Sequence, residues 1–230
     1  MKRLTRTVFS TLLLPAAASA ASRNYELPRF EAVSVAAGIS ADIHMGASQS
    51  VVAESKSGDF DDLRVTVEGK VLRIDRPQRG WFSFGGQRTA YQIHVVTPTL
   101  HSLRASSGAD ARLEGEVAGD FSAEASSGAD IRVAHLKGDN VKLEASSSGD
   151  ITIAGSCASL AVAASSGADI EAAGLQCAKV TVDASSGSDI SVAATSSVAG
   201  SASSGADVRV TGAPAVVQVS RSAGADVRVK

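Results

Sequence analysis

The hexapeptide ASSGAD occupies residues 105–110 and recurs unchanged at residues 125–130, 164–169 and 202–207. Near copies stand at residues 145–150 (ASSSGD), 184–189 (ASSGSD) and 221–226 (RSAGAD). The aspartates that end the seven copies are separated by 20, 20, 19, 20, 18 and 19 residues. Such a constant period is typical of a fold that stacks one structural unit on the next.

Alternating apolar and polar side chains flank each copy of the motif. DIRV at residues 130–133 and DVRV at residues 207–210 follow the aspartate, whereas VKLEA at residues 141–145 and VTVDA at residues 180–184 precede the next corner. Alternation of this kind, rich in Ile and Val, predicts β-strands with their apolar side chains inward. Each unit should therefore contain two short strands and two corners.

Two strands of about five residues can bury their apolar sides only if each lies beside its copies in neighbouring units, about 4.8 Å away. The sequence therefore predicts an all-β fold, a right-handed parallel β-helix or β-solenoid with about 20 residues per coil. Aromatic residues are only 4% of the chain, so the core of this solenoid should be thin.

The repeated motif is best explained as one corner of each coil. Its glycine is expected to adopt positive φ, which is unfavourable for residues that carry a Cβ. Small side chains fit a narrow corner, and the Ser hydroxyls and Asp carboxylates can cap unpaired backbone N–H groups. The glycines expected in this conformation are Gly108, Gly128, Gly167, Gly187, Gly205 and Gly224.

The chain before the repeats divides into three parts. Residues 1–20 have a basic start, a short apolar run and an A-x-A ending, which predict a cleaved secretory signal peptide. Residues 21–29 are expected to be an N-terminal linker. Residues 30–104 should form the N-terminal β layers and cap of the solenoid, whose regular repeats occupy residues 105–230.

Two features of the ends can be predicted. LRVTVEGKVLRIDRP at residues 63–77 predicts a hairpin that turns near Gly69, and GISADIHM at residues 38–45 looks like a degenerate corner and strand. At the other end, Arg228 and Lys230 are expected to guard an open sheet edge.

Charge and hydropathy limit the partners and the location. Removing three basic residues with the signal segment changes 22 Lys and Arg to 19 against 24 Asp and Glu, and this mild acidity argues against nucleic acid as a partner. No segment approaches the roughly 20 apolar residues that a transmembrane helix needs. We expect an exported protein of the periplasm or cell surface, without a transmembrane segment in the mature chain.

Cys157 and Cys177 both lie seven residues before a copy of the motif, so they should occupy the same position in adjacent coils. A strand spacing near 4.8 Å falls within the Cα separation of disulfides, and oxidising compartments favour the bond. We therefore predict a disulfide. The alternative is two free thiols in a thin core.

The repeated aspartates form the sharpest candidate site. Stacked carboxylates repel one another, and either a bound Ca²⁺ or a neighbouring arginine can relieve the repulsion. Arginine stands two residues after four of the aspartates, at Arg112, Arg132, Arg209 and Arg228, but not after Asp150, Asp169 and Asp189. These three are the candidates for a cation column, although we favour a structural role. No other cofactor is indicated.

The segment RPQRGWFSFGGQR at residues 76–88 gathers Trp81, Phe82 and Phe84 between arginines. These aromatic side chains can seal the solenoid, which is the interpretation we favour. Alternatively, they form an interaction loop for a glycan, a protein or a membrane surface.

The chain resembles the bacterial head GIN domain family, also described as auto-transporter adhesins. The resemblance lies in FEAVSVAAGISADIHMG at residues 30–46, LRVTVEGKVLRI at residues 63–74, YQIHVVTPTLHSLRASSGAD at residues 91–110 and the repeats that follow. It implies a right-handed parallel β-helix in an exported bacterial protein.

No catalytic pattern is visible, because His44, His94, His101 and His135 are scattered and no serine has a histidine near it. The sequence therefore favours a noncatalytic exported scaffold of the envelope or cell surface, adhesin-like, with an envelope component, glycan or protein as its partner. The alternatives are a carbohydrate-active β-helix enzyme that uses acidic residues of the middle coils, and a calcium-stabilised structural module.

Overall fold

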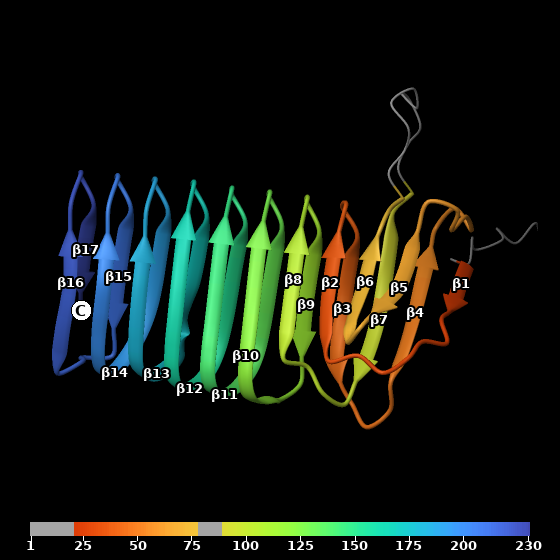
Figure 1. Ribbon diagram of the computed structural model, residues 1–230, viewed down its shortest axis with the longest axis horizontal. Helices are drawn as coiled ribbons and strands as arrows, with labels where there is room; N and C mark the ends of the chain where they lie inside the picture. The colour runs from red at the N-terminus through yellow and green to blue at the C-terminus, as the bar shows by residue number, and fades with distance from the viewer. Residues whose placement is uncertain (1–20, 78–88) are drawn as a thin grey trace, which may run out of the picture.

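The computed structural model describes residues 21–77 and 89–230, and these residues form strands and no helix. The strands stack into a β-solenoid, which confirms the predicted fold (Figure 1). The irregular end contains β1 (Ala21–Asn24), β2 (Ala32–Ala36), β3 (Ser40–Met45), β4 (Ser50–Ser55), β5 (Arg64–Glu68), β6 (Val71–Asp75) and β7 (Tyr91–Thr97). The repeats contain β8 (Ser102–Ser106), β9 (Asp110–Glu114), β10 (Val117–Ser126), β11 (Asp130–Ser146), β12 (Asp150–Ser165), β13 (Asp169–Ala184), β14 (Asp189–Ala202), β15 (Asp207–Thr211), β16 (Val216–Arg221) and β17 (Asp226–Val229).

Each coil has two faces joined by the sharp corner that the motif forms. Face A consists of the strands that lead into the corners, namely β2, β8, most of β10, the second parts of β11 to β14, and β16. Face B consists of the strands that leave the corners, namely β3, β9, the first parts of β11 to β14, β15 and β17. The strands within each of these sets pair in parallel.

The register places equivalent residues of successive coils side by side. Asp110 pairs with Asp130, and the alignment continues through Asp150, Asp169, Asp189, Asp207 and Asp226. The repeat period in the sequence is therefore one coil of the structure.

The N-terminal layers do not follow the order of the chain. The coil of β2 and β3 lies directly beside β8 and β9, although 65 residues separate the end of β2 from the start of β8 along the chain. The intervening strands β6 and β7 pair with the other side of the β2–β3 coil, as the orange and yellow strands of Figure 1 show. The first coil is thus held between two later segments.

Antiparallel strands close this end of the solenoid. The predicted hairpin is β5 and β6, which turns at Gly69 with positive φ. β4 runs antiparallel to β7, and β1 runs antiparallel to β4. Residues 21–24 are therefore a strand of the fold, so the expected linker at residues 21–29 is wrong for this part. Residues 1–20, the expected signal peptide, lie outside the described residues.

Each corner contains two consecutive residues with positive φ. In the first clean copy, Ser107 has φ 55° and Gly108 has φ 71°, and the Ala109 N–H donates to the Ser106 carbonyl at 3.3 Å. This is the pattern of a type I′ turn. All six glycines that the sequence analysis named have positive φ, so that prediction is confirmed. The residue before each of these glycines also adopts positive φ without being glycine, which the repeat alone does not predict.

Backbone hydrogen bonds connect every corner to its neighbours. The Gly108 N–H donates to the Ser127 carbonyl of the next coil at 3.0 Å, and the Asp130 N–H donates back to the Ala109 carbonyl at 3.0 Å. Equivalent bonds recur in the other corners. The expected capping by Ser hydroxyls and Asp carboxylates is therefore wrong as a general rule, because backbone carbonyls already accept from these N–H groups. Ser188 is a local exception, since its hydroxyl accepts from the Ser185 N–H at 3.2 Å.

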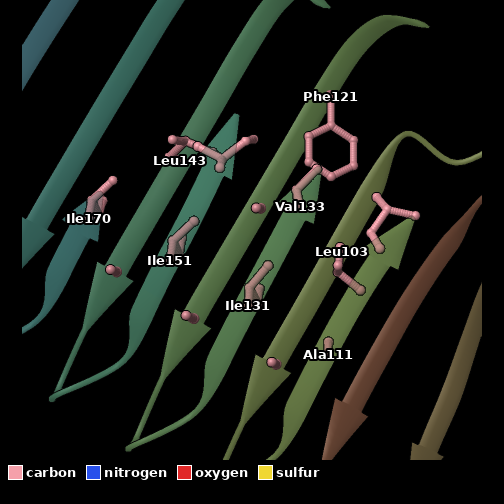
Figure 2. Close-up of a cluster of buried hydrophobic side chains, with 14 of the residues drawn as sticks. Leu103, Ala111, Phe121, Ile131, Val133, Leu143, Ile151 and Ile170 are labelled. Atoms are coloured by element: carbon pink, nitrogen blue, oxygen red, sulfur yellow. The ribbon is translucent and has the colours of Figure 1, made fainter. Parts of the chain in front are cut away.

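The core is narrow at the corners and wider away from them. Both alanines of the motif point inward, as Ala105 and Ala109 do with 2% and 0% exposure, while Ser107 and Gly108 are exposed. Larger side chains fill the interior farther from the corner (Figure 2). The buried side chains labelled there are Leu103, Phe121 and Leu143 from face A and Ala111, Ile131, Val133, Ile151 and Ile170 from face B, and Ala111 is the one small residue among them.

The corner at residues 145–150 offers a matched test of the backbone strain. Here the glycine is displaced by one residue, so that Ser148, with φ 58°, stands where Gly128 has φ 69°. No atom lies within 4 Å of a Cβ built on Gly128, so Gly128→Ser should cost only backbone strain, about 1 kcal/mol of unfolding free energy. Ser148→Gly should stabilise the protein by a similar or smaller amount. Chemical denaturation measures both, and equal stabilities for all three proteins would contradict this explanation.

Candidate functional site

Side chains that point outward from face B form two adjacent columns. We call the seven aligned aspartates the aspartate column. The mixed column lies two residues farther along each strand and contains Arg112, Arg132, Thr152, Glu171, Ser191, Arg209 and Arg228. Because the register is conserved from coil to coil, each column continues along the solenoid with one side chain in every coil.

A groove of about 340 Å³ runs over the last four coils of face B. The polar side chains that line it belong to both columns: Asp169, Glu171, Asp189, Ser191, Asp207, Arg209, Asp226 and Arg228. Carboxylates predominate on the side of β13, and guanidinium groups are added toward β17. The groove therefore offers hydrogen-bond acceptors and donors of opposite charge in a fixed array.

The charges of the groove are unevenly neutralised. The Arg228 guanidinium lies 2.6 Å from the Asp226 carboxylate, and the Arg209 guanidinium donates to the Ser191 hydroxyl at 3.4 Å. Partial burial in the groove raises the pKa of Asp189, the carboxylates of Asp169 and Asp207 add to this rise, and Arg209 opposes it. The surroundings of Asp189 therefore disfavour the charged form of its carboxyl group.

The three aspartates proposed as a cation column, Asp150, Asp169 and Asp189, are aligned in consecutive coils. Within residues 21–77 and 89–230, no group of three or more His, Cys, Asp or Glu side chains is arranged to hold a metal ion. Calcium needs six to eight oxygen ligands around one point, whereas a ladder of parallel strands sets its carboxylates in a line. A cation at these residues would have to draw neighbouring carboxylates together.

Cys157 and Cys177 form the predicted disulfide. They are paired in the register of β12 and β13, with Cα atoms 4.5 Å apart. The bond lies in the connection from face B to face A, away from the motif corners. It joins two adjacent coils covalently in the middle of the regular repeats.

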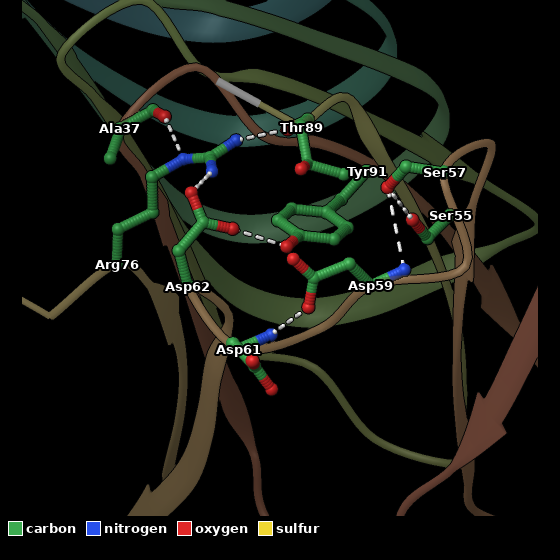
Figure 3. A network of polar contacts seen from close by, with 9 residues as sticks. All are labelled: Ala37, Ser55, Ser57, Asp59, Asp61, Asp62, Arg76, Thr89 and Tyr91. Carbon is green, nitrogen blue, oxygen red and sulfur yellow. Dashed lines mark hydrogen bonds and ion pairs between the residues drawn. The ribbon is translucent and has the colours of Figure 1, made fainter. Parts of the chain in front are cut away.

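The predicted interaction loop of Trp81, Phe82 and Phe84 lies outside the described residues. The structure does describe its two flanks, residues 76–77 and residues 89–90, which a polar network joins (Figure 3). Arg76 donates to the Thr89 carbonyl at 2.6 Å and to the Ala37 carbonyl at 3.0 Å, and it forms an ion pair with Asp62 at 2.5 Å. Only 9% of its side chain is exposed, so Arg76 joins the two flanks structurally and its charge is largely shielded from solvent.

Tyr91 completes this network beneath the guanidinium group. The Arg76 guanidinium lies 4.9 Å from the centre of the Tyr91 ring, and the Tyr91 hydroxyl donates to Asp62 (Figure 3). Burial and the bond to Asp62 raise the pKa of Tyr91 to about 12. Phe60 stacks on Tyr91 with ring centres 6.1 Å apart, so the base of the loop is anchored in the core.

A second polar cluster lies on face B at the N-terminal end. The His94 ring nitrogens lie 4.0 Å from the Asp42 carboxylate and 3.8 Å from the Glu54 carboxylate. The Gln92 side-chain amide donates to the Asp42 carboxylate at 2.9 Å. Sequence reasoning treated the histidines as scattered because β7 returns beside β3 only through the rearranged order of the N-terminal layers. No spacing in the sequence signals this contact.

Face A differs from face B in chemistry. Its outward side chains are mostly small and uncharged over the later coils. Four of its charged residues form ion pairs, Arg104 with Glu124 and Lys142 with Glu144, both at 2.9 Å. A shallow hollow of about 530 Å³ lies over this face. Face A therefore offers a weaker charged array than the groove of face B.

Together these features define a repeat protein of the β-solenoid class with a polar groove on one face. The model of a family described as "Putative auto-transporter adhesin, head GIN domain" matches residues 29–214, so the chain belongs to that family. The resemblance seen in the sequence is thereby confirmed. No curated protein matches the chain.

Several solved structures share the fold. A putative adhesin from Bacteroides fragilis has a TM-score of 0.81 at 15% identity, covering 93% of this chain and 98% of its own. A putative adhesin from Parabacteroides merdae has a TM-score of 0.69 at 14% identity, covering 92% and 96%. A putative lipid binding protein from Parabacteroides distasonis has a TM-score of 0.68 at 17% identity, covering 91% and 96%. In the described part of this chain, no helix is long and apolar enough to cross a membrane.

The disulfide should contribute measurably to stability. It closes a loop of 20 residues, for which the loss of unfolded-state entropy is worth about 3 kcal/mol. Cys157→Ala combined with Cys177→Ala should therefore lower the melting temperature by about 5–10 °C. The neighbours of the pair in the column are Gly138 and Ala194, so alanine fits the space. Reductant should lower the melting temperature of the wild type and leave that of the double variant unchanged.

The raised pKa of Asp189 leads to a pH-dependent prediction. Since its folded-state pKa lies above the unfolded value of about 3.9, folding favours the protonated carboxyl, and stability from this group is lost as the pH rises through the folded pKa. Asp189→Asn should therefore raise the melting temperature at pH 7 by about 1–3 °C, and the gain should disappear near pH 3. Asp226→Asn is the matched control, because it removes a carboxylate paired with Arg228 and should give no gain at pH 7. A gain at Asp189 that persists at pH 3 would contradict this explanation.

Proposed function

We propose that the protein is an exported, noncatalytic scaffold of the cell envelope or cell surface, and that it contacts its partner through the groove of face B. Membership of a family described as adhesins supports binding in place of catalysis. The disulfide between adjacent coils suits a compartment outside the cytoplasm. The expected signal peptide at residues 1–20 agrees with export.

The observation that carries this proposal is the continuous groove of about 340 Å³ with both signs of charge in register. A polar, extended partner can repeat its contacts along such an array, because the donors and acceptors recur once in each coil. A glycan of the envelope or an extended polar protein segment has this chemistry. The mildly acidic chain and the carboxylates of the groove disfavour nucleic acid.

A carbohydrate-active enzyme is the second candidate, and one observation favours it. Asp189 has a raised pKa and lies between two other aspartates, which is the environment of a carboxyl that donates a proton in glycoside hydrolysis. The third candidate, a calcium-stabilised module, requires a bound cation to draw together the aligned carboxylates of Asp150, Asp169 and Asp189.

The decisive experiment measures, by cosedimentation, how much of the purified protein binds to isolated cell envelopes. It compares the wild type with a groove variant and with a control variant on face A. Asp169→Asn, Asp189→Asn and Arg209→Gln together remove charges from the groove and should reduce binding about tenfold or more. The matched control on face A, Lys142→Gln with Glu144→Gln and Asp183→Asn, should bind like the wild type. Equal binding by all three proteins would contradict the role of the groove. In a separate fractionation of cells, absence of the protein from the envelope fraction would contradict export.

The same proteins separate the other two functions. Release of reducing ends from envelope polysaccharides by the wild type, lost in Asp189→Asn, would establish the enzyme. A large rise in melting temperature with excess Ca²⁺ over chelator, lost when Asp150, Asp169 and Asp189 are replaced by asparagine, would establish the calcium module.

A further inference from the structure

The last coil that the structure describes, formed by β16 and β17, has an edge with which no described strand pairs. β16 pairs only with β14, and β17 pairs only with β15, so the other side of each strand carries free backbone N–H and C=O groups among the described residues. The large exposed apolar side chains of the described chain gather here: Val216, Val217 and Val229, with 40% to 48% exposure. Edges of this kind readily add another strand.

One residue of this coil breaks the repeat. The inward position next to the corner is alanine in six successive coils, and each of these alanines is 1–3% exposed. They are Ala105, Ala125, Ala145, Ala164, Ala184 and Ala202. In the last coil the same position is Arg221, which pairs with Ala202 in the register of β14 and β16. Arg221 therefore occupies the register position at which the other six coils carry a methyl group, and the residue is exposed in this coil because no described strand covers it.

The pattern of the edge fits a second copy of this chain. Within one coil β16 runs toward the corner and β17 runs away from it, so two coils related by a twofold axis can pair β16 of each with β17 of the other in antiparallel fashion. The inward residues then match, with Val219 opposite Val227 and Val217 opposite Val229 of the second copy. The two edges would be satisfied by each other, and the exposed valines would be buried.

Arg221 is the obstacle to this pairing. In the same register it lies opposite Ala225 of the second copy, and the two copies of Arg221 face each other across the narrow end of the core. Burying two like charges without partners is strongly unfavourable. Arg228, which the sequence suggested as a guard together with Lys230, belongs to the outward mixed column and lies 2.6 Å from Asp226, so this pairing would not bury it.

We propose that Arg221 is a stop residue, which keeps the C-terminal edge of the solenoid from pairing with a second copy of the chain. The edge is otherwise complementary to itself. A charge at this register position would be buried by the pairing of two copies, so it keeps the two edges apart. This role differs from partner binding and does not rest on the proposed function.

The test is the oligomeric state of the whole chain by analytical ultracentrifugation over a wide concentration range. The wild type and Arg221→Lys, which keeps the charge, should remain monomers. Arg221→Ala, which restores the residue of the other six coils, should form a dimer with affinity on the order of 100-fold higher than the wild type. A wild type that is already dimeric through this edge, or a monomeric Arg221→Ala, would overturn the proposal.

A second substitution identifies the surface that forms the dimer. Val229→Asp added to Arg221→Ala places a carboxylate in the inward row of β17 and should return the protein to a monomer. Matching circular dichroism spectra for all variants establish that each is folded. Open-ended polymers of Arg221→Ala would also overturn the proposal, because tail-to-tail pairing consumes both edges and stops at two copies.

Discussion

The alignment of identical corners is the constraint on which the rest of the molecule depends. Two residues of each corner have positive φ, and their backbone groups bond both to the coil before and to the coil after. A coil that shifted by one residue would lose these bonds and would also turn its apolar side chains outward. The corner therefore fixes the register of both faces, and the straight columns of the surface follow from it.

This constraint explains why the motif contains almost only small residues. Two alanines face inward where the faces meet, the serine and glycine take the tight turn, and the aspartate begins the next strand. Each of these residue types is explained by its place in the corner. Only the aspartate also presents a functional group on the outer surface, where it could contact a partner. The chemical variety of the protein is accordingly confined to the outward positions, above all the mixed column, where arginine gives way to Thr152, Glu171 and Ser191 in the middle coils.

Sequence reasoning succeeded where a feature repeats. The period, the strand pattern, the six corner glycines and the cysteine pair all follow from counting, because one coil in the structure is one period in the chain. It failed where the chain departs from the period. The contact of β2 with β8 and the cluster around His94 depend on a return of the chain that no local pattern encodes. The buried role of Arg76 could not be predicted for the same reason, since its partners Asp62 and Thr89 come from separate segments.

The placement of the β2–β3 coil between β6–β7 and β8–β9 bears on how the protein is made. A simple solenoid can grow coil by coil as the chain emerges, since each coil needs only the one before it. Here the earliest coil gains both of its neighbours only after residue 114 has left the ribosome or the export channel. Roughly the first half of the chain must therefore wait for its partners, and the orderly addition of coils can begin only from that point onward.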